Sequence, residues 1–279
     1  MVRISGFGSR GPYQDRPGYG TLAEAIGGFA HHTGDPHGPP VLPGFPVADT
    51  ITGLMAAVGA LASLFDREVR NRTGRSGAVV DINLLTSMAF MATPRLIEYQ
   101  LSGIPPNRQG NRLYGGSPRN AAKCRDGKWV AYSAHSPAMI ANVVKAVGLE
   151  GDPMFATMEE AILHGDALDS AIVTWISNLD RATVLGELLD LGVPVAPVND
   201  AADILADENL VAREDLVDVY DVWTGRPLTI VASPIEVDGG RNPPKSTGFE
   251  IGEHNREIYG DMLGVTDEEL ETLKGRGVI

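Results

Sequence analysis

The spacing of apolar residues predicts one long helix in the first quarter of the chain. From residue 50 onward, apolar side chains recur every three or four positions, with glycine and alanine between them. The apolar positions are Ile51, Leu54, Met55, Val58, Leu61, Ala62 and Phe65. Because such a face is typical of a core helix, we expect a buried helix over residues 50–68.

Shorter apolar runs predict strands that are interleaved with further helices. We expect strands at residues 2–5, 79–84, 128–132, 193–198 and 227–231. We expect helices at residues 22–29, 84–99, 137–147, 158–163, 168–178, 181–191, 202–208, 255–263 and 267–275. A stretch rich in glycine, proline and asparagine, residues 103–120, interrupts this order as a linker. Strands that alternate with helices predict an α/β fold.

Composition narrows the class of protein. With 279 residues, 43% of them hydrophobic, the chain can bury a substantial core in one large or two smaller domains. The net charge of −13 argues against a nucleic-acid partner. We find no run of about 18 uncharged apolar residues and no signal peptide, so we expect no membrane span and a cytoplasmic location. The single cysteine, Cys124, excludes an internal disulfide framework and has no activating neighbour in the sequence.

Charge is distributed unevenly along the chain. Residues 95–128 carry seven basic side chains against two acids, whereas residues 150–221 are rich in acids and contain only Arg181 and Arg213 as bases. An anionic substrate would prefer the first of these segments. The alternative interpretation is that both segments are solvated faces.

Asp49 is the strongest candidate for chemistry. It ends a Pro/Gly-rich loop immediately before the predicted helix. An acid at this place is a preferred N-cap, which is the structural interpretation. A carboxylate that is held ionised at a helix start is also a plausible covalent nucleophile. The residue pattern alone leaves both roles open.

Two tempting motifs have weaker support. Residues 6–11 match G-x-G-x-x-G, but Pro12 and another Pro/Gly cluster follow, so no helix can start close to the loop as a dinucleotide site requires. His31, His32 and His37 form a cluster in a Gly/Pro loop with Asp35 as the only nearby acid. Metal sites need facing ligands with defined spacing, so we expect no metal site and place these histidines on a surface loop.

A series of short segments resembles the family III CoA-transferases of the CaiB/BaiF type, which include formyl-CoA transferase. The segments follow the family's order and approximate spacing over essentially the whole chain. They are residues 4–8 (ISGFG), 11–13 (GPY), 15–19 (DRPGY), 33–40 (TGDPHGPP), 47–49 (VAD), 75–82 (RSGAVVDI), 110–112 (GNR), 192–199 (GVPVAPVN), 252–254 (GEH) and 277–279 (GVI).

The resemblance implies an α/β fold with a partial Rossmann-like large domain and a smaller α/β domain. Residues 1–100 would belong to the large domain, 101–120 to a linker with a glycine turn, 121–225 to the small domain, and 226–279 to a return to the large domain. Family members are longer at the N-terminus, so we expect the first strands to be missing here. Homodimers are typical of the family, and a partner subunit that supplies the missing region is the alternative.

The resemblance also implies a function. Asp49 would carry CoA between a donor acyl-CoA thioester and an acceptor carboxylic acid, with no permanently bound cofactor. Tyr19, Gly115, Gly116 and Glu253 match family positions that contact substrate or CoA. A simple linker turn at Gly115-Gly116 and helix capping by Glu253 are the structural alternatives.

Two other functions remain open. Related racemases carry a histidine at the position of Tyr19, and tyrosine is a poor substitute for that base, so an acyl-CoA racemase or epimerase is the less favoured enzyme. The other alternative is a non-catalytic subunit or fragment that needs a partner chain.

Overall fold

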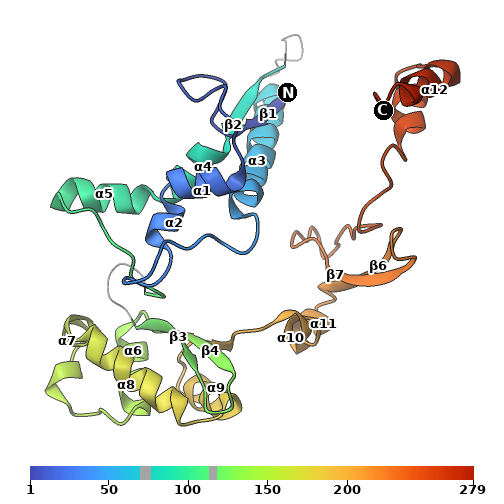
Figure 1. The fold of residues 1–279 in the computed structure, drawn as a ribbon. Helices are drawn as coiled ribbons and strands as arrows, with labels where there is room; N and C mark the ends of the chain where they lie inside the picture. Colours follow the sequence, from blue (N-terminus) through green and yellow to red (C-terminus); the bar gives the residue numbers. More distant parts are fainter. Residues whose placement is uncertain (70–76, 113–117) are drawn as a thin grey trace. The chain divides into compact units, whose positions relative to one another are not determined.

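The structure is a computed structural model that describes residues 1–69, 77–112 and 118–279. Its fold is mixed α/β, as expected from the alternation of strands and helices. The chain forms two compact units, Met1–Val198 with two sheets and Asn199–Ile279 with one (Figure 1). The division into four parts that the resemblance implies stays a prediction.

The first part of the N-terminal unit pairs two strands with a group of helices. Its elements are β1 (Val2–Ser5), α1 (Gly20–Ile26), α2 (Phe29–His32), α3 (Val47–Val69), β2 (Val80–Asn83), α4 (Leu84–Met91) and α5 (Thr93–Ser102). Strands β1 and β2 are parallel, with Val2 opposite Val80 and Ser5 opposite Asn83. Parallel pairing places the carboxyl ends of both strands at one edge, where α/β folds commonly hold their ligands.

Helix α3 packs through its small residues, which corrects the prediction that its large apolar face is buried. Ala48, Thr52 and Ala56 are buried, and a Cβ atom added at Gly59 would lie 2.7 Å from Val80 Cγ1. Leu54 and Val58, by contrast, are 63% and 66% exposed. Small side chains let the helix approach the strands closely, so the large apolar side chains point away from them.

The exposed side of α3 forms an apolar stripe. Its large members are Leu54, Val58, Leu61, Leu64, Phe65 and Val69, each at least 48% exposed. By length and composition α3 would also reach across a membrane, with a mean hydropathy of 1.6 and 17% of that window buried. The uncharged part of α3, residues 50–65, is shorter than the run of about 18 that the sequence criterion requires, so the expectation of no membrane span stays a prediction. Core helices of water-soluble proteins meet the same criterion.

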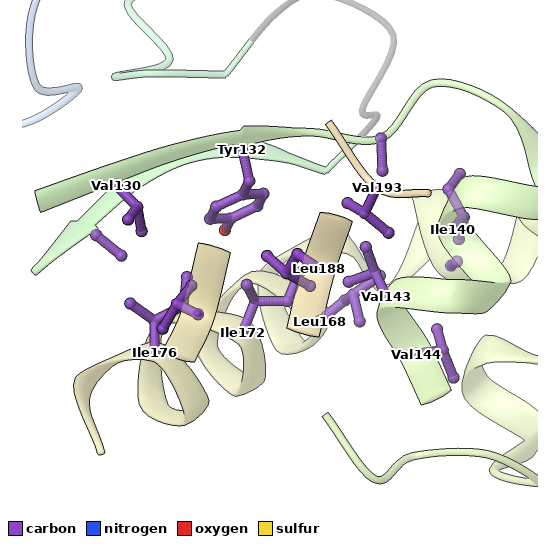
Figure 2. Packing of buried hydrophobic residues seen from close by; sticks show 14 of the residues in the cluster. Val130, Tyr132, Ile140, Val143, Val144, Leu168, Ile172, Ile176, Leu188 and Val193 are labelled. Atoms are coloured by element: carbon purple, nitrogen blue, oxygen red, sulfur yellow. The ribbon is translucent and has the colours of Figure 1, made fainter. Parts of the chain in front are cut away.

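The second part of the N-terminal unit, residues 119–198, is a three-stranded antiparallel sheet covered by helices; we call it the antiparallel lobe. The strand order is β3-β4-β5. Its elements are β3 (Arg119–Lys123), β4 (Trp129–Ser133), α6 (Pro137–Ala146), η1 (Pro153–Phe155), α7 (Met158–Leu163), α8 (Gly165–Ser177), α9 (Arg181–Asp190) and β5 (Val195–Pro197). Val130 and Tyr132 point from the sheet onto α8 and α9 (Figure 2).

This lobe contains the main hydrophobic core of the described chain. Leu168, Ile172 and Ile176 repeat every four residues along α8 and are at most 1% exposed. They meet Val130 and Tyr132 of β4 and Leu188 of α9 (Figure 2). Four-residue spacing places side chains on one helix face, which explains why the sequence predicted this helix well.

The C-terminal unit is built from short elements. They are α10 (Ala201–Leu205), α11 (Glu208–Ala212), β6 (Leu216–Asp221), β7 (Arg226–Val231), the π-helix η2 (Arg256–Met262) and α12 (Asp267–Gly275). Strands β6 and β7 form an antiparallel hairpin. The buried carboxylate of Asp221 closes its turn by accepting hydrogen bonds from the backbone and hydroxyl of Thr224, at 2.7 and 2.6 Å.

Several element boundaries differ from the prediction. The helix expected over residues 84–99 is two helices that break at Ala92, because Pro94 lies in the first turn of α5 and cannot continue α4. The helix expected over 22–29 breaks at Gly28, whose φ of 89° is left-handed. The segment 202–208 divides at Asp207, whose side chain caps α11. Strands β3 and β6 were not predicted, and β3 begins inside the expected linker.

Candidate active site

Asp49 lies in the first turn of α3, and this corrects its predicted place immediately before the helix. The helix begins at Val47, and the carbonyl of Pro46 accepts the backbone N–H of Thr50 at 3.0 Å and its hydroxyl at 2.8 Å. Proline next to a helix start is favourable because its φ is already close to the helical value. Asp49 is therefore not the N-cap, and its side chain is not used to close the helix.

A different acid performs the capping. Glu24 lies on α1, is only 4% exposed, and accepts the backbone N–H of Ala48 at 3.2 Å. An acid at a helix N-terminus satisfies an amide that has no partner within the helix and is favoured by the helix dipole. Sequence reasoning missed Glu24 because an acid in a short amphipathic helix is normally solvent-facing. Its only signal in the sequence was that apolar residues surround it, with Ala23 before it and Ala25 and Ile26 after it.

Tyr19 and Gly20 lie beside the candidate nucleophile. Gly20 opens α1, and a Cβ atom added there would lie 2.6 Å from Asp49 Oδ2. Tyr19 is the extended residue before the helix, and its carbonyl accepts the N–H groups of Leu22 and Ala23 at 3.0 and 3.3 Å. The structure thus brings the backbone at Tyr19 and Gly20 next to the Asp49 carboxylate. The Tyr19 ring itself is 78% exposed.

The Asp49 side chain is exposed and available. Among the residues that the structure describes, none forms a hydrogen bond or an ion pair with its carboxylate. An exposed carboxylate without a cation or donor keeps both oxygens free to attack an electrophile. The first-turn amides of α3 favour negative charge close to it.

The loop between β1 and α1 places the start of α1 beside the Asp49 carboxylate. Gly6 and Gly18 pack backbone to backbone, since a Cβ atom on Gly6 would lie 2.8 Å from Gly18 Cα. The Gly6 carbonyl also accepts the N–H of Leu85 at 3.1 Å, so the loop is fixed to the first turn of α4, directly after β2. The first helix after the G-x-G-x-x-G segment begins at Gly20, as predicted when the dinucleotide interpretation was rejected.

For the remaining predicted site residues, the structure gives no position relative to Asp49. Gly115 and Gly116 lie outside the described residues. Glu253 lies in the C-terminal unit, where its carboxylate accepts the backbone N–H of Glu250 at 2.9 Å. This hydrogen bond closes a local turn rather than the start of η2, which follows Asn255. The substrate roles of Gly115, Gly116 and Glu253 stay predictions.

The histidines are more structured than a surface loop. His31 and His32 are the last residues of α2, with their rings edge to face at 5.0 Å. Burial, together with the charges of His31 and Arg95, holds the pKa of His32 below its usual value. No group of three or more His, Cys, Asp or Glu side chains within the described ranges is arranged to hold a metal.

Most of the basic segment proves to be structural, which corrects its interpretation as an anion-binding region. Arg108 donates to the backbone carbonyls of His31, Asp35 and Gly38, at 3.2, 3.1 and 2.8 Å. Arg112 pairs with Asp166 and Asp169 of α8. Arg95 pairs with Glu98, and Arg125 pairs with Asp180. Besides Arg108, the basic side chains of this segment without a carboxylate partner among the described residues are Arg119, Lys123 and Lys128.

Cys124 offers no competing nucleophile. Its side chain is 4% exposed within the core of the antiparallel lobe. Burial raises the pKa of the thiol, and the nearby acid Asp126 adds to this effect. A buried, protonated thiol is unreactive.

Comparison with known proteins decides the family. The sequence profile of CoA-transferase family III matches residues 1–255. The chain belongs to CoA-transferase family III. As a family III CoA-transferase it moves CoA between acyl-CoA thioesters and carboxylic acids. The resemblance found in the short segments is thereby confirmed.

Individual relatives of this family III CoA-transferase are similar over its whole length. It is 34% identical to succinyl-CoA–D-citramalate CoA-transferase of Chloroflexus aurantiacus, a match that covers 100% of this chain and 69% of the relative. It is 33% identical to formyl-CoA:oxalate CoA-transferase of Streptomyces avermitilis, with 99% and 70% covered. The beta subunit of a succinyl-CoA–L-malate CoA-transferase from C. aurantiacus is 32% identical, with 100% and 69% covered.

A solved structure supports the fold. The crystal structure of a CAIB/BAIF family protein from Brucella suis superposes with a TM-score of 0.75 at 27% identity, over 93% of this chain and 67% of that one. The mixed α/β architecture is therefore that of the family.

Proposed function

We propose that Asp49 is the nucleophile of this CoA-transferase. The observation that supports the assignment is the position of its carboxylate, exposed and unpaired in the first turn of α3, where a Cβ atom on Gly20 would lie 2.6 Å from Oδ2. Because glycine has no Cβ atom, the carboxylate can lie close to the backbone of α1, and the first-turn amides of α3 favour negative charge near it.

The reaction follows from carboxylate chemistry. Asp49 attacks the donor thioester carbonyl, which forms a mixed anhydride and expels the CoA thiolate. The thiolate attacks the aspartyl carbonyl, so the donor acid leaves and CoA remains on Asp49 as a thioester. The acceptor carboxylate then attacks this thioester and regenerates a thiolate, which takes the acceptor acyl group and frees Asp49. Each step exchanges one acyl bond for another, and no redox partner or metal is needed.

Mass spectrometry with hydroxylamine trapping tests this proposal. The purified chain is incubated with succinyl-CoA or formyl-CoA, the donors named in two relatives, and then with hydroxylamine. We expect a hydroxamate on Asp49, no hydroxamate in Asp49→Ala, and an unchanged adduct in Asp190→Ala, which removes an exposed acid at the end of α9. A hydroxamate on another acid would refute the assignment of Asp49 as the nucleophile. In deuterated water, deuterium that enters the acyl α-carbon would favour a racemase.

We further propose that the working enzyme contains a second chain, either a copy or a partner subunit. The apolar stripe of α3 supports this, because large apolar side chains that are exposed along one helix face mark an interaction site. The fold within the assembly would be a Rossmann-like large domain to which residues 1–100 and 226–279 contribute, with a smaller domain over 121–225. Light scattering should give about twice the chain mass of 29.6 kDa, and Leu61→Glu should reduce it to one chain.

A further inference from the structure

Helix α1 presents two features to the start of α3. Glu24 places a buried carboxylate on the Ala48 amide, at 3.2 Å. Gly20 lies four residues earlier on α1, where a Cβ atom would meet Asp49 Oδ2 at 2.6 Å and Ala48 Cβ at 3.5 Å. Positions four apart lie on one face of a helix, so both features belong to one contact surface.

The burial of Glu24 calls for an explanation. It follows the buried Ala23 on α1 and bonds the buried Ala48, and no cation among the described residues pairs with it. A buried carboxylate is costly unless it is hydrogen-bonded or paired. An alanine or leucine would fill this position at less cost if only packing mattered. The Ala48 amide that Glu24 holds belongs to the residue directly before Asp49.

We infer that Glu24 and Gly20 are positioning residues for Asp49. Glu24 fixes the backbone directly before the nucleophile, and Gly20 leaves the space that its carboxylate occupies. This inference rests on the proposed role of Asp49. Neither residue touches a reacting atom, so both act by holding the attacking oxygens in one place.

Three substitutions separate positioning from simple packing. Glu24→Ala removes the acceptor, and a displacement near 1 Å at a reacting group lowers turnover by about 100-fold, so we expect kcat to fall about 10- to 100-fold with KM nearly unchanged. Glu24→Gln keeps an oxygen acceptor for the Ala48 amide, so we expect turnover to stay within about 3-fold. Rescue by glutamine supports the positioning role, whereas loss of turnover in the folded glutamine variant overturns it.

Gly20→Ala gives a readout that a merely structural role would not. Alanine favours a helix more than glycine does, so the variant should melt at an equal or higher temperature. Its methyl group would force the Asp49 carboxylate into another rotamer, so turnover should fall about 10-fold. Stability and activity therefore move in opposite directions. Gly186→Ala, at a helical glycine of α9 with open space around it, is the matched control and should leave turnover unchanged.

A second measurement does not depend on turnover. Carbodiimide and an amine label accessible carboxylates, and peptide mass spectrometry gives the labelling rate of Asp49 in each variant. Hydrogen exchange reports on the Ala48 amide. We expect Glu24→Ala to speed exchange at Ala48 at least 10-fold and to change Asp49 labelling, while Glu24→Gln and the exposed control Glu187→Ala change neither.

The outcomes are distinguishable. If Glu24→Ala leaves exchange at Ala48, Asp49 labelling and turnover unchanged, Glu24 has no positioning role. If Gly20→Ala leaves turnover and labelling unchanged, the space at Gly20 has no role. If Asp49→Ala retains turnover, the proposed function fails, and exchange at Ala48 still decides whether Glu24 holds the α3 start. If Glu24→Ala does not fold, Glu24→Gln and Gly20→Ala still test the inference, since loss of turnover in the folded glutamine variant overturns it.

Discussion

Removal of the Asp169 carboxylate should destabilise the antiparallel lobe more than any other single substitution of a polar residue in this lobe. Asp169 is 7% exposed on α8 and accepts four hydrogen bonds. Its Oδ1 accepts the Tyr132 hydroxyl at 2.7 Å. Its Oδ2 accepts Asn120 Nδ2 at 2.9 Å and the Arg112 Nη2 and Nε at 3.0 and 3.2 Å. One carboxylate therefore joins α8 to β3, β4 and the segment that precedes β3.

The magnitude follows from what each substitution leaves unpaired. Breaking a buried ion pair by removing one partner costs about 3–5 kcal/mol. Asp169→Ala should cost about 3 kcal/mol, the lower end, because Arg112 keeps Asp166 as a second partner. Tyr132→Phe removes one hydrogen bond to a charged acceptor, which is worth about 1.5 kcal/mol. Asp166→Ala should cost less than about 1 kcal/mol, because its side chain is 91% exposed and screened by solvent.

Hydrogen exchange at β4 amides measures these differences without assuming that the two units unfold together. Since 1.4 kcal/mol is a factor of ten, Asp169→Ala should speed exchange at Val130 and Tyr132 about 150-fold, and Tyr132→Phe at Val130 about 10-fold. Asp166→Ala should change it less than about 5-fold. An effect of Asp166→Ala equal to that of Asp169→Ala would refute the role of Asp169 as the hub. So would a Tyr132→Phe variant that exchanges at the wild-type rate.

Three further predictions concern stability. Burial and the adjacent Asp169 raise the pKa of Tyr132, so above about pH 10 this phenol ionises only in the unfolded chain. The free energy of unfolding should therefore fall as the pH rises above this value. Alkaline denaturation should show a less steep fall in Tyr132→Phe. Leu168→Ala should cost about 2–5 kcal/mol in urea unfolding, whereas the exposed Leu189→Ala should cost under about 1 kcal/mol. Arg108→Ala should speed amide exchange in residues 31–41 and leave β4 unaffected; equal protection in both proteins would contradict its three carbonyl contacts.

The sequence predicted elements well where one local pattern determined them. Helix α7 (Met158–Leu163) and helix α12 (Asp267–Gly275) have the expected bounds, because each begins with a threonine cap followed by acids. Strand β3 was missed, since its polar ends and small centre lack alternation, and it is held by pairing with β4. Pairing partners distant in sequence leave no local signal.

The orientation of α3 shows a second limit of sequence reasoning. The large apolar side chains were expected to face the core, yet the small residues do, with Ala48 and Thr52 fully buried. A periodic pattern identifies the faces of a helix but not the neighbour that each face meets. The sequence singled out Asp49 by its position, and its role as nucleophile stays a prediction, whereas Glu24, which holds the same turn, was marked only by its apolar neighbours in the sequence.

Arg108 and Arg112 give the segment between them an upper limit on length. Arg108 is anchored on three carbonyls of residues 31–38, and Arg112 on two carboxylates of α8. Four extended residues span at most about 14 Å between Cα atoms. As long as both sets of contacts hold, the backbone from Arg108 to Arg112 therefore sets the greatest distance between the two anchoring residues. A longer segment at this place would relax that limit, whereas a substitution within it would not.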